Sequence, residues 1–160
     1  MRKQKITPEM KLIASIIGGI RSLNARNCGV KDAKIGPQSG FDADQDGFLG
    51  ELAFCKMMNL CPDFGLNPRS GSADAVLSKD GVIFRIDVKT TRRINGRLCA
   101  TLKHNPDVDI YVLAIIDEEN QEILFPGFAF TKDLCQEENI INLGHGKGYA
   151  LQQNKLRGWK

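Results

Sequence analysis

A tight turn at Asp80-Gly81 is the sequence feature that most constrains how this chain can fold. Asp-Gly is typical of a type I′ turn, which needs positive φ at both central residues and joins two antiparallel strands. With the residues on either side of the turn paired, counting backwards places Asp74 opposite Asp87. The sequence therefore predicts a β-hairpin whose register is fixed by its turn.

Side chains alternate across a strand, so the predicted hairpin has two different faces. Its apolar face consists of Leu77, Val82, Phe84, Ile86 and Val88. Its other face carries Asp74, Arg85, Asp87 and Lys89. Like charges that oppose each other across a sheet are destabilising, so the paired aspartates indicate a cation between them. The alternative is a charged face covered only by water, and we favour the metal site because close unpaired carboxylates are costly.

The composition is that of one globular domain. The chain has 160 residues, 42% of them hydrophobic and 26% charged, which is enough for a hydrophobic core. No apolar run is long enough to span a bilayer, and we find no signal peptide. The five cysteines lack CxxC spacing, so we expect reduced thiols in a cytoplasmic protein.

Basic residues are clustered, although the net charge is only +3. Residues 1–35 hold eight Lys or Arg against two acidic residues. The other two clusters are Lys89, Arg92, Arg93, Arg97 and Lys103, and Lys155, Arg157 and Lys160. This segregation favours a polyanion as partner. For the N-terminal segment, a solvated basic face is an equal alternative.

Two helices are expected before the hairpin. Thr7-Pro8 is a helix start, with the threonine as N-cap, and apolar residues then recur at helical spacing to about residue 26. Gly, Pro and Asp predict a loop over 27–46. A second helix is expected from near residue 46 to about 60, ended by Pro62.

Strands dominate the part of the chain after the hairpin. We expect strands at 98–103, 109–116 and 122–125, a short helix capped by Thr131, and an edge strand at Tyr149–Leu151. The strand at 109–116 is apolar on both faces, as in a central strand covered by helices on both sides. This order predicts an α/β sandwich with a mixed sheet.

The charged face of the hairpin has the ligands that a hard divalent cation prefers. Mg²⁺ binds carboxylates, carbonyls and water, so Asp74, Asp87 and the backbone carbonyl of Val88 are candidate ligands. Lys89 is placed to orient an attacking water or to stabilise negative charge that develops during phosphodiester hydrolysis. Glu51 lies on the second helix, which must pack on the sheet, and its carboxylate could reach the same cation.

This set of motifs resembles the PD-(D/E)xK nuclease superfamily. The resemblance runs over residues 46–130 and rests on Gly50–Phe54, Ser72–Asp74, Asp87–Thr91 and Asp109–Leu113, in that order. Alanine precedes the first aspartate where the family pattern has proline, and Asp87 stands where glutamate is commoner. The order and spacing are most similar to small phage-type nucleases and Holliday junction resolvases.

The resemblance implies a fold, a cofactor and roles for residues. The fold would be a restriction endonuclease-like sandwich, a mixed sheet of four to five strands flanked by helices. Asp74 and Asp87 would bind Mg²⁺, or Mn²⁺ as a substitute, Lys89 would be the catalytic lysine, and Glu51 would be a direct or water-mediated ligand. The activity would be DNA hydrolysis by an endonuclease that is structure-specific, nicking or weakly sequence-specific. The alternatives are an RNA-cleaving member and a nuclease-fold module that binds DNA or protein without cutting.

We expect one domain over residues 1–160. It would comprise a basic helical segment at 1–36, a nuclease core at 46–130, and a C-terminal helix and edge strand at 131–160. The expected partner is nucleic acid, DNA before RNA, with a homodimer left open. The expected location is the cytoplasm of a bacterium or of a phage-infected host.

Further polar residues near the motifs are candidates for phosphate binding. They are Arg69, Ser70, Thr90, Thr91, Arg92, Arg93, Arg97 and Lys103. Asn95-Gly96 is a second hairpin-turn signal, which would place the three later arginines around a loop tip beside the cleavage site. For Arg69 and Ser70 an ordinary turn is the alternative, and for the threonines an ordinary strand.

Two other patterns have simpler interpretations. Asp42–Gly47 matches the opening of an EF-hand loop, but Ala53 occupies the twelfth position, where a bidentate glutamate belongs. We therefore favour an acidic loop that caps the second helix. His104 is interpreted as a surface histidine in preference to a general base.

Overall fold

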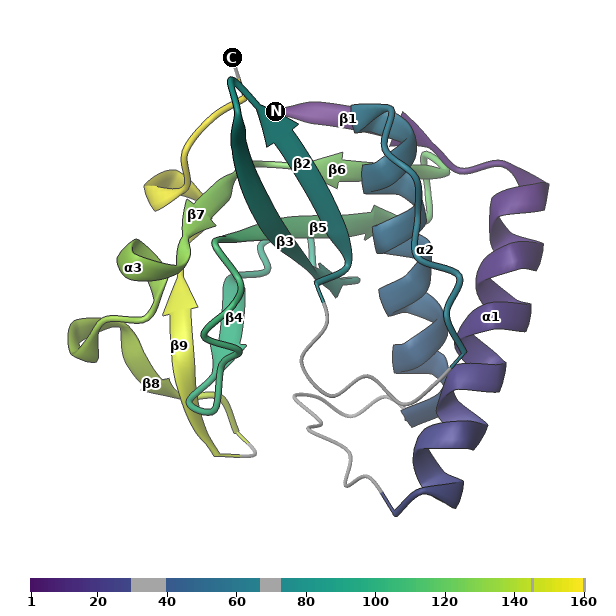
Figure 1. The fold of residues 1–160 in the computed structure, drawn as a ribbon, viewed down its shortest axis with the longest axis horizontal. Helices are drawn as coiled ribbons and strands as arrows, with labels where there is room; N and C mark the ends of the chain where they lie inside the picture. The colour runs from purple at the N-terminus through teal and green to yellow at the C-terminus, as the bar shows by residue number, and fades with distance from the viewer. Residues whose placement is uncertain (30–39, 67–72, 145, 160) are drawn as a thin grey trace.

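The computed structural model describes residues 1–29, 40–66, 73–144 and 146–159. Its helices are α1 (Pro8–Asn27), α2 (Gly40–Met58) and α3 (Thr131–Leu134). Its strands are β1 (Arg2–Lys5), β2 (Ala75–Lys79), β3 (Val82–Thr91), β4 (Leu98–Thr101), β5 (Ile110–Asp117), β6 (Glu122–Phe125), β7 (Phe128–Phe130), β8 (Ile140–Asn142) and β9 (Lys147–Leu151). Short 3₁₀ turns occupy Glu137–Asn139 and Gln153–Lys155. The protein is thus mixed α/β, as predicted (Figure 1).

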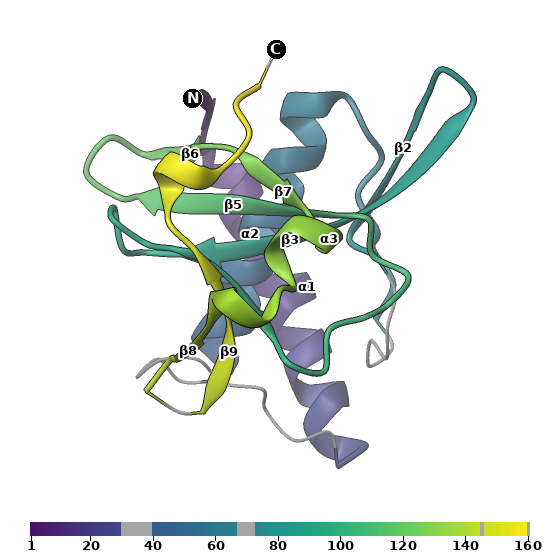
Figure 2. The ribbon, with the colours of Figure 1, turned by 90° about the vertical axis from the view of Figure 1, so that its left-hand side faces the viewer.

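The main sheet is mixed and has the strand order β1-β6-β5-β3-β2, with β7 also paired to β5. Strands β3 and β5 run parallel, and the other pairs are antiparallel. A second, antiparallel sheet has the order β4-β9-β8. In Figure 2 this small sheet and α3 face the viewer, while α1 and α2 lie behind the main sheet.

Strand β5 is buried on both faces, but only one face is covered by the two long helices. Its even-numbered residues from Ile110 to Ile116 join the core with α1 and α2. Its odd-numbered residues from Tyr111 to Ile115 pack with β4, β9 and α3. The prediction of helices on both sides was therefore wrong, because the C-terminal strands pair with β4 and form a sheet of their own over this face.

The hairpin of β2 and β3 has the predicted turn and register. Asp80 and Gly81 both have positive φ, 51° and 78°, and Lys79 pairs with Val82. The tip of the hairpin projects beyond the sheet (Figure 2). The predicted apolar face is consequently buried only toward the base, at Ile86 and Val88, and is exposed at Val82 near the tip.

Helix α1 has the predicted start but packs through a different face. Thr7 is its N-cap, because the Thr7 side chain accepts a hydrogen bond from the Met10 backbone N–H at 3.3 Å. Small residues pack against α2: a Cβ at Gly18 would lie 2.8 Å from the backbone oxygen of Asp44. Glycines at 18 and 19, which by propensity weaken a helix, thus allow the two helices to approach closely. The larger aliphatic residues of α1 lie mainly on its outer face.

Helix α2 begins at Gly40, six residues before the predicted start. Residues 42–46 are helical, so the prediction of an acidic loop that caps the helix was wrong, and the disfavoured EF-hand loop does not form either. The helix ends at Met58, before Pro62. Asn59 has φ 54°, and the N–H of Leu60 donates to the carbonyl of Cys55 at 2.8 Å, which is the Schellman pattern. Residues 30–39 of the predicted loop lie outside the described residues.

Two details near the C-terminus differ from expectation. Thr131 is the first residue of α3, with Phe130 as N-cap, and its hydroxyl donates to the carbonyl of Val108. Strand β9 is the middle strand of the small sheet and not an edge strand, because β4 and β8 pair on either side of it. Strands β1, β7 and β8 were not predicted.

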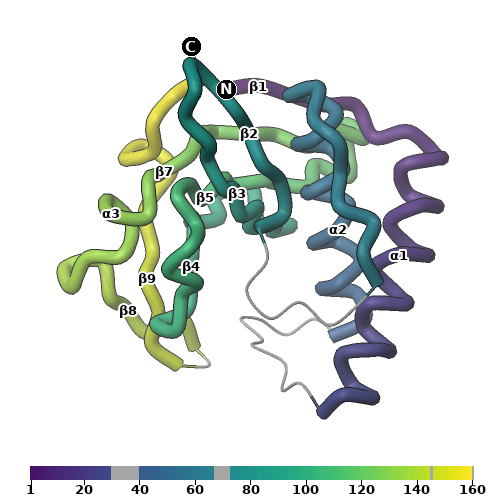
Figure 3. Tube along the Cα trace, in the orientation of Figure 1, coloured from purple at the N-terminus to yellow at the C-terminus, as the bar shows by residue number. Residues whose placement is uncertain are grey.

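The first and last described segments meet at one end of the molecule (Figure 3). Arg2 lies over the ring of Trp159, 5.9 Å from its centroid. The indole N–H of Trp159 donates to the carbonyl of Phe125 on β6 at 2.8 Å, so both segments anchor to the main sheet. Within the described ranges, none of the helices combines the length and apolar character needed to span a membrane.

Candidate active site

The base of the β2–β3 hairpin brings Asp74 and Asp87 together. The register of the hairpin ends at the pair Ala75–Ile86, and the N–H of Asp74 also donates to the carbonyl of Ile86, at 2.8 Å. The predicted pairing of Asp74 with Asp87 is therefore not part of the strand ladder. The N–H of Val88 donates to Oδ2 of Asp74, also at 2.8 Å. The carboxylate of Asp74 therefore reaches the backbone of β3 directly after Asp87.

Lys89 forms an ion pair with Asp87 on the same strand. Its Nζ lies 2.6 Å from Oδ1 of Asp87, and the two side chains are 41% and 18% exposed. Burial by itself lowers the pKa of Lys89, but the charge of Asp87, with smaller contributions from Asp74 and Glu51, raises this pKa above its ordinary value. Lys89 is therefore fully cationic at neutral pH.

Tyr111, on the neighbouring strand β5, lies beside Asp87 and Lys89. The parallel register of β3 and β5 pairs Asp87 with Tyr111, and Nζ of Lys89 lies 5.8 Å from the centre of the tyrosine ring. Burial raises the pKa of Tyr111, and the negative charge of Asp87 raises it further, so the phenol stays protonated. Sequence reasoning gave Tyr111 no role, because the apolar run of β5 contains no signal that sets its register against β3.

Glu51 is held on α2 by an ion pair with Arg21 of α1. Nη1 of Arg21 lies 3.0 Å from Oε2 of Glu51, and both side chains are largely buried. Arg21 also donates from Nε to the carbonyl of Gly65 at 2.8 Å, and its guanidinium lies 4.5 Å from the centre of the Phe48 ring. Sequence reasoning counted Arg21 only as part of the basic N-terminal segment, whereas it positions the predicted site glutamate.

The carboxylates at the hairpin base are suited to a divalent cation. Oδ1 of Asp87 is buried and accepts no regular hydrogen bond, so its contact with Nζ of Lys89 is an ion pair without hydrogen-bond angles. Such an oxygen, next to Asp74, fits a hard cation. Among the residues that the structure describes, no group of three or more His, Cys, Asp or Glu is gathered as a metal site. The roles of Glu51 and the Val88 carbonyl as ligands stay predictions.

The two threonines after Lys89 have structural contacts. The hydroxyl oxygen of Thr90 is buried without a hydrogen-bond partner, and a Cβ at Gly50 of α2 would lie 2.1 Å from it. Oγ1 of Thr91 accepts a hydrogen bond from the N–H of Arg93 at 3.2 Å. Thr90 therefore lies where α2 approaches β3 closely, and Thr91 stabilises the turn that follows. Phosphate binding by either residue stays a prediction.

Arg92 is paired with Asp46 of α2 and with Glu118, which lies in the turn after β5. Its Nε and Nη2 lie 2.5 and 2.7 Å from the two carboxylate oxygens of Asp46, which is buried, and Nη1 contacts Glu118. The hydrogen bonds that Arg92 donates to Asp46 are the main reason that the pKa of Arg92 is raised. Sequence reasoning missed this contact because Asp46 and Arg92 are far apart in the chain.

The second hairpin predicted at Asn95-Gly96 does not form. Strand β3 pairs with β2 and β5, while β4 pairs with β9 in the other sheet. Asn95 and Gly96 lack the positive φ of a type I′ turn, and the N–H of Gly96 donates to the carbonyl of Arg93 at 2.8 Å. The segment is an ordinary turn that carries the chain from one sheet to the other.

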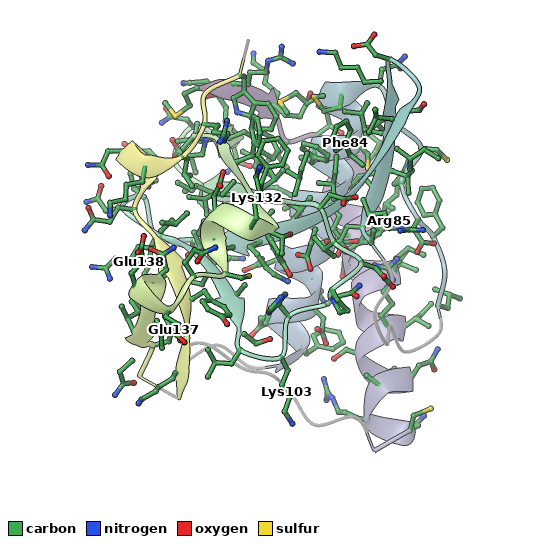
Figure 4. All side chains as sticks on the ribbon, turned by 60° about the vertical axis from the view of Figure 1, so that its left-hand side comes forward. Phe84, Arg85, Lys103, Lys132, Glu137 and Glu138 are labelled. Atoms are coloured by element: carbon green, nitrogen blue, oxygen red, sulfur yellow. The ribbon has the colours of Figure 1, made fainter. Side chains whose placement is uncertain are left out.

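The remaining basic candidates are solvent-exposed. Arg93, Arg97 and Lys103 all lie at the surface, and Lys103 extends away from the body of the molecule (Figure 4). An open polar hollow beside the turn is lined by Asn95, Arg97, Gln152, Gln153 and Asn154. Arg69 and Ser70 lie outside the described residues.

His104 is half-buried and packs edge-on against Tyr149 of β9, with ring centroids 5.7 Å apart. Its Nδ1 is buried without a hydrogen-bond partner. It is therefore more enclosed than the surface histidine that we expected.

Comparison of the chain with protein-family models, curated proteins and solved structures gives no match.

Proposed function

We propose that this protein is a Mg²⁺-dependent endonuclease that hydrolyses phosphodiester bonds in DNA, with Mn²⁺ as a substitute cation. We also propose that its mixed α/β fold is of the restriction endonuclease-like kind. The observation that carries the proposal is the hairpin base, where Asp74 and Asp87 adjoin and Lys89 lies 2.6 Å from Asp87.

The proposed roles follow from the chemistry of each group. Asp74 and Asp87 would hold the cation, which supplies Lewis-acid polarisation of the phosphate and makes water a stronger acid when bound. The hydrogen bond from the Val88 N–H fixes the direction of one Asp74 oxygen. Fixed ligand geometry limits the reorganisation needed when a ligand binds.

Lys89 supplies the positive charge of the site. Its raised pKa keeps the ammonium group protonated at neutral pH, so it is suited to stabilising negative charge on the phosphate and unsuited to accepting a proton from water. The ion pair with Asp87 holds the ammonium near the scissile position. Glu51 is held on α2 by its ion pair with Arg21 of α1, and its negative charge contributes to the raised pKa of Lys89.

The decisive experiment is a cleavage panel with matched variants. Supercoiled plasmid, single-stranded DNA, branched DNA and RNA are each incubated with Mg²⁺, Mn²⁺ or EDTA. We expect DNA cleavage with either cation, none with EDTA, and loss of cleavage in Asp87→Asn. The control is Lys79→Ala, an exposed lysine at the tip of the same hairpin, which should cut at the wild-type rate.

Four results would contradict the proposal or its substrate. Cleavage that persists in EDTA, or in Asp87→Asn, would move the chemistry away from this site. DNA binding without cleavage of any substrate would favour the non-cleaving module. Cleavage restricted to RNA would keep the site and change the substrate.

A further inference from the structure

The outer face of α1 is apolar although it is exposed. Leu12, Ile16 and Leu23 are 62%, 52% and 54% exposed, and Ile20 is half-buried beside them. At 100° per residue these four side chains fall within an arc of about 80° on the helix. We call these four residues the outer stripe. A helix at the surface of a monomer normally turns polar residues outward, whereas contiguous exposed apolar surface marks an interaction site.

The opposite face of α1 already has its partner. Ala14, Gly18 and Ser22 are buried on this face, and the backbone of α2 approaches Gly18 closely. Gly19 is also buried but lies beside the outer stripe, where a Cβ would meet the Phe41 ring at 3.2 Å. Folding of the domain therefore uses the small residues of α1, and the outer stripe is not needed to join α1 to α2.

Opposite charges flank the outer stripe at its two ends. Glu9 is in the first turn of α1 and Arg26 is in the last turn, and both residues are exposed. They are 17 residues apart, or roughly 26 Å along a helix, so they cannot pair within one chain. Each of them lies where it could meet the other on a second, antiparallel helix.

Two pairs of these residues are placed symmetrically about the middle of α1, whereas Ile16 and Ile20 are centred half a residue away, on Gly18. Leu12 and Leu23 are equidistant in sequence from the point between Ile17 and Gly18, and so are Glu9 and Arg26. A two-fold axis at this point would place Leu12 opposite the partner's Leu23. The same axis would place Glu9 opposite the partner's Arg26, and would set the two helix dipoles antiparallel.

We propose that the outer stripe of α1 is the interface with a second copy of this chain, paired antiparallel about a two-fold axis near Ile17–Gly18. In such an isologous contact every interaction occurs twice. The dimer has two Leu12–Leu23 contacts, two Glu9–Arg26 ion pairs, and Ile16 and Ile20 of both chains close to the axis. The inference is independent of the proposed function, because it uses no residue of the hairpin base.

The first test is sedimentation equilibrium over a wide range of protein concentration. The wild type should be a dimer, and Leu23→Glu should raise the dissociation constant at least about a hundredfold, because it buries a charge twice in the interface. The matched control is Ile83→Glu at the hairpin tip, where the wild-type side chain is 63% exposed; it should leave the dimer intact. Far-UV circular dichroism should show equal helix content in all three proteins.

The second test addresses the register by charge exchange. Glu9→Arg and Arg26→Glu should each weaken self-association, roughly tenfold at low salt, by replacing two ion pairs with two repulsive contacts. A mixture of the two variants should form a heterodimer with wild-type stability. In it one chain is basic at both positions and the other is acidic at both, so each of the two contacts again joins opposite charges. Effects on the isolated helices are the same in the mixture and in the separate variants.

Three outcomes would overturn the inference. A wild type that is monomeric at all concentrations would show that the outer stripe is not an interface. A Leu23→Glu variant that still forms a dimer would place the contact elsewhere. Failure of the mixed variants to recover association would exclude the antiparallel register.

Discussion

Two clusters of similar composition lie at strand β3 and just after its end, and their contacts differ. Asp74, Asp87 and Lys89 form the hairpin-base cluster, while Asp46, Arg92 and Glu118 form a second cluster at the end of the strand. Each contains two carboxylates and one cation. In the second cluster the planar guanidinium of Arg92 binds both oxygens of Asp46, which is the geometry that stabilises a carboxylate most fully.

The hairpin-base cluster has no such bidentate contact. Lysine is a compact point charge, and it approaches one oxygen of Asp87 without regular hydrogen-bond angles. Bidentate pairing at Asp46 ties α2 to β3, whereas the hairpin base brings together two carboxylates that a lysine only partly neutralises. The contacts of the Arg92 cluster are therefore those of a structural ion pair, and the hairpin base is where we propose that a cation binds.

The largest effect is expected at Lys89, in the hairpin-base cluster. Lys89→Ala should reduce DNA cleavage by ~10²–10³-fold, the effect of removing one preorganised electrostatic group, with DNA affinity nearly unchanged. Single-turnover cleavage and a separate binding assay measure the two quantities. Stability should fall only slightly at neutral pH, since the ammonium is partly exposed.

The pH dependence of stability at this residue has a definite sign. Because the folded pKa of Lys89 is raised, the stabilisation is complete below the ordinary lysine pKa and is lost as pH rises through the higher folded value. The difference in the free energy of unfolding between wild type and Lys89→Ala should therefore be the same at pH 6 and at pH 8. A difference that changed over this interval would assign the titration to another group.

The next largest effect is expected from metal binding, which should depend on the hairpin-base cluster and not on the Arg92 cluster. A cation that binds only the folded protein adds RT ln(1 + [L]/Kd), about 2.7 kcal/mol at a hundredfold excess over Kd. Asp74→Asn should remove most of the stabilisation by Mg²⁺ or Mn²⁺, and Asp46→Asn should keep it. Thermal denaturation with each cation and with EDTA measures both. An equal metal-induced shift in Asp74→Asn and wild type would count against the hairpin-base site.

Arg92→Met should lower stability and leave cleavage unchanged, the opposite of the result expected for Lys89→Ala. It leaves Asp46 buried without its guanidinium, and breaking a fully buried pair costs ~3–5 kcal/mol. Because the Arg92 side chain is 43% exposed, solvent screening reduces this, and we expect a loss of about 1–2 kcal/mol in the free energy of unfolding. Urea denaturation measures the loss, and cleavage per folded molecule should be unchanged. A cleavage defect without a stability defect would reverse the assignment.

The parts of the fold that the sequence predicted are those encoded by local signals. Asp80-Gly81 determines its turn through positive φ and thereby the hairpin register, and Thr7-Pro8 determines the start of α1 through capping chemistry. The same turn brings Asp74 near Asp87, although the paired register extends only to Ala75–Ile86 and the N–H of Asp74 donates to the carbonyl of Ile86. These features depend on a few neighbouring residues, so a single sequence suffices to find them.

The features that were missed depend on contacts between distant segments. Nothing near Asp42–Asp46 distinguishes an acidic loop from the first turns of α2, whose packing against Gly18 is a tertiary contact. Likewise, Asn95-Gly96 has the sequence of a hairpin turn, but β4 finds its partner in β9, about fifty residues later. The assignment of Arg92 to a loop tip failed for the same reason.

Gly50 offers a smaller test of how closely α2 must approach the site. A Cβ at Gly50 would lie 2.1 Å from Oγ1 of Thr90, so Gly50→Ala must displace the Thr90 side chain, the helix or β3. Overpacking of this kind costs about 1–3 kcal/mol, partly offset by the better helix propensity of alanine, about 1 kcal/mol. Thr90→Ala removes the obstructing oxygen, so adding it to Gly50→Ala should restore the stability that Gly50→Ala loses.

The readout for Gly50 is a double-mutant cycle in urea. The double variant should be more stable than the sum of the two single effects, since neighbouring residues couple. Gly47→Ala is the matched control, because a Cβ at Gly47 would have no atom within 4 Å and alanine should stabilise the helix there. Additive single effects would show that Thr90 does not limit the approach of α2.

The smallest expected effect concerns the exposed arginines beside the Arg92 cluster. Each phosphate contact on duplex DNA contributes about −0.9 to the slope of log Kobs against log[salt]. Arg93 and Arg97 are exposed, so replacing both with Ala should flatten this slope by roughly one to two units and weaken binding to all sequences alike. Stability should hardly change, because exposed charges contribute little. The matched variant Arg92→Met should leave the slope nearly unaltered, since its guanidinium is already engaged by Asp46. If Arg92→Met flattened the slope more than the double variant did, the ion pair with Asp46 would open on DNA binding, and the structural role that we assign to this cluster would be wrong.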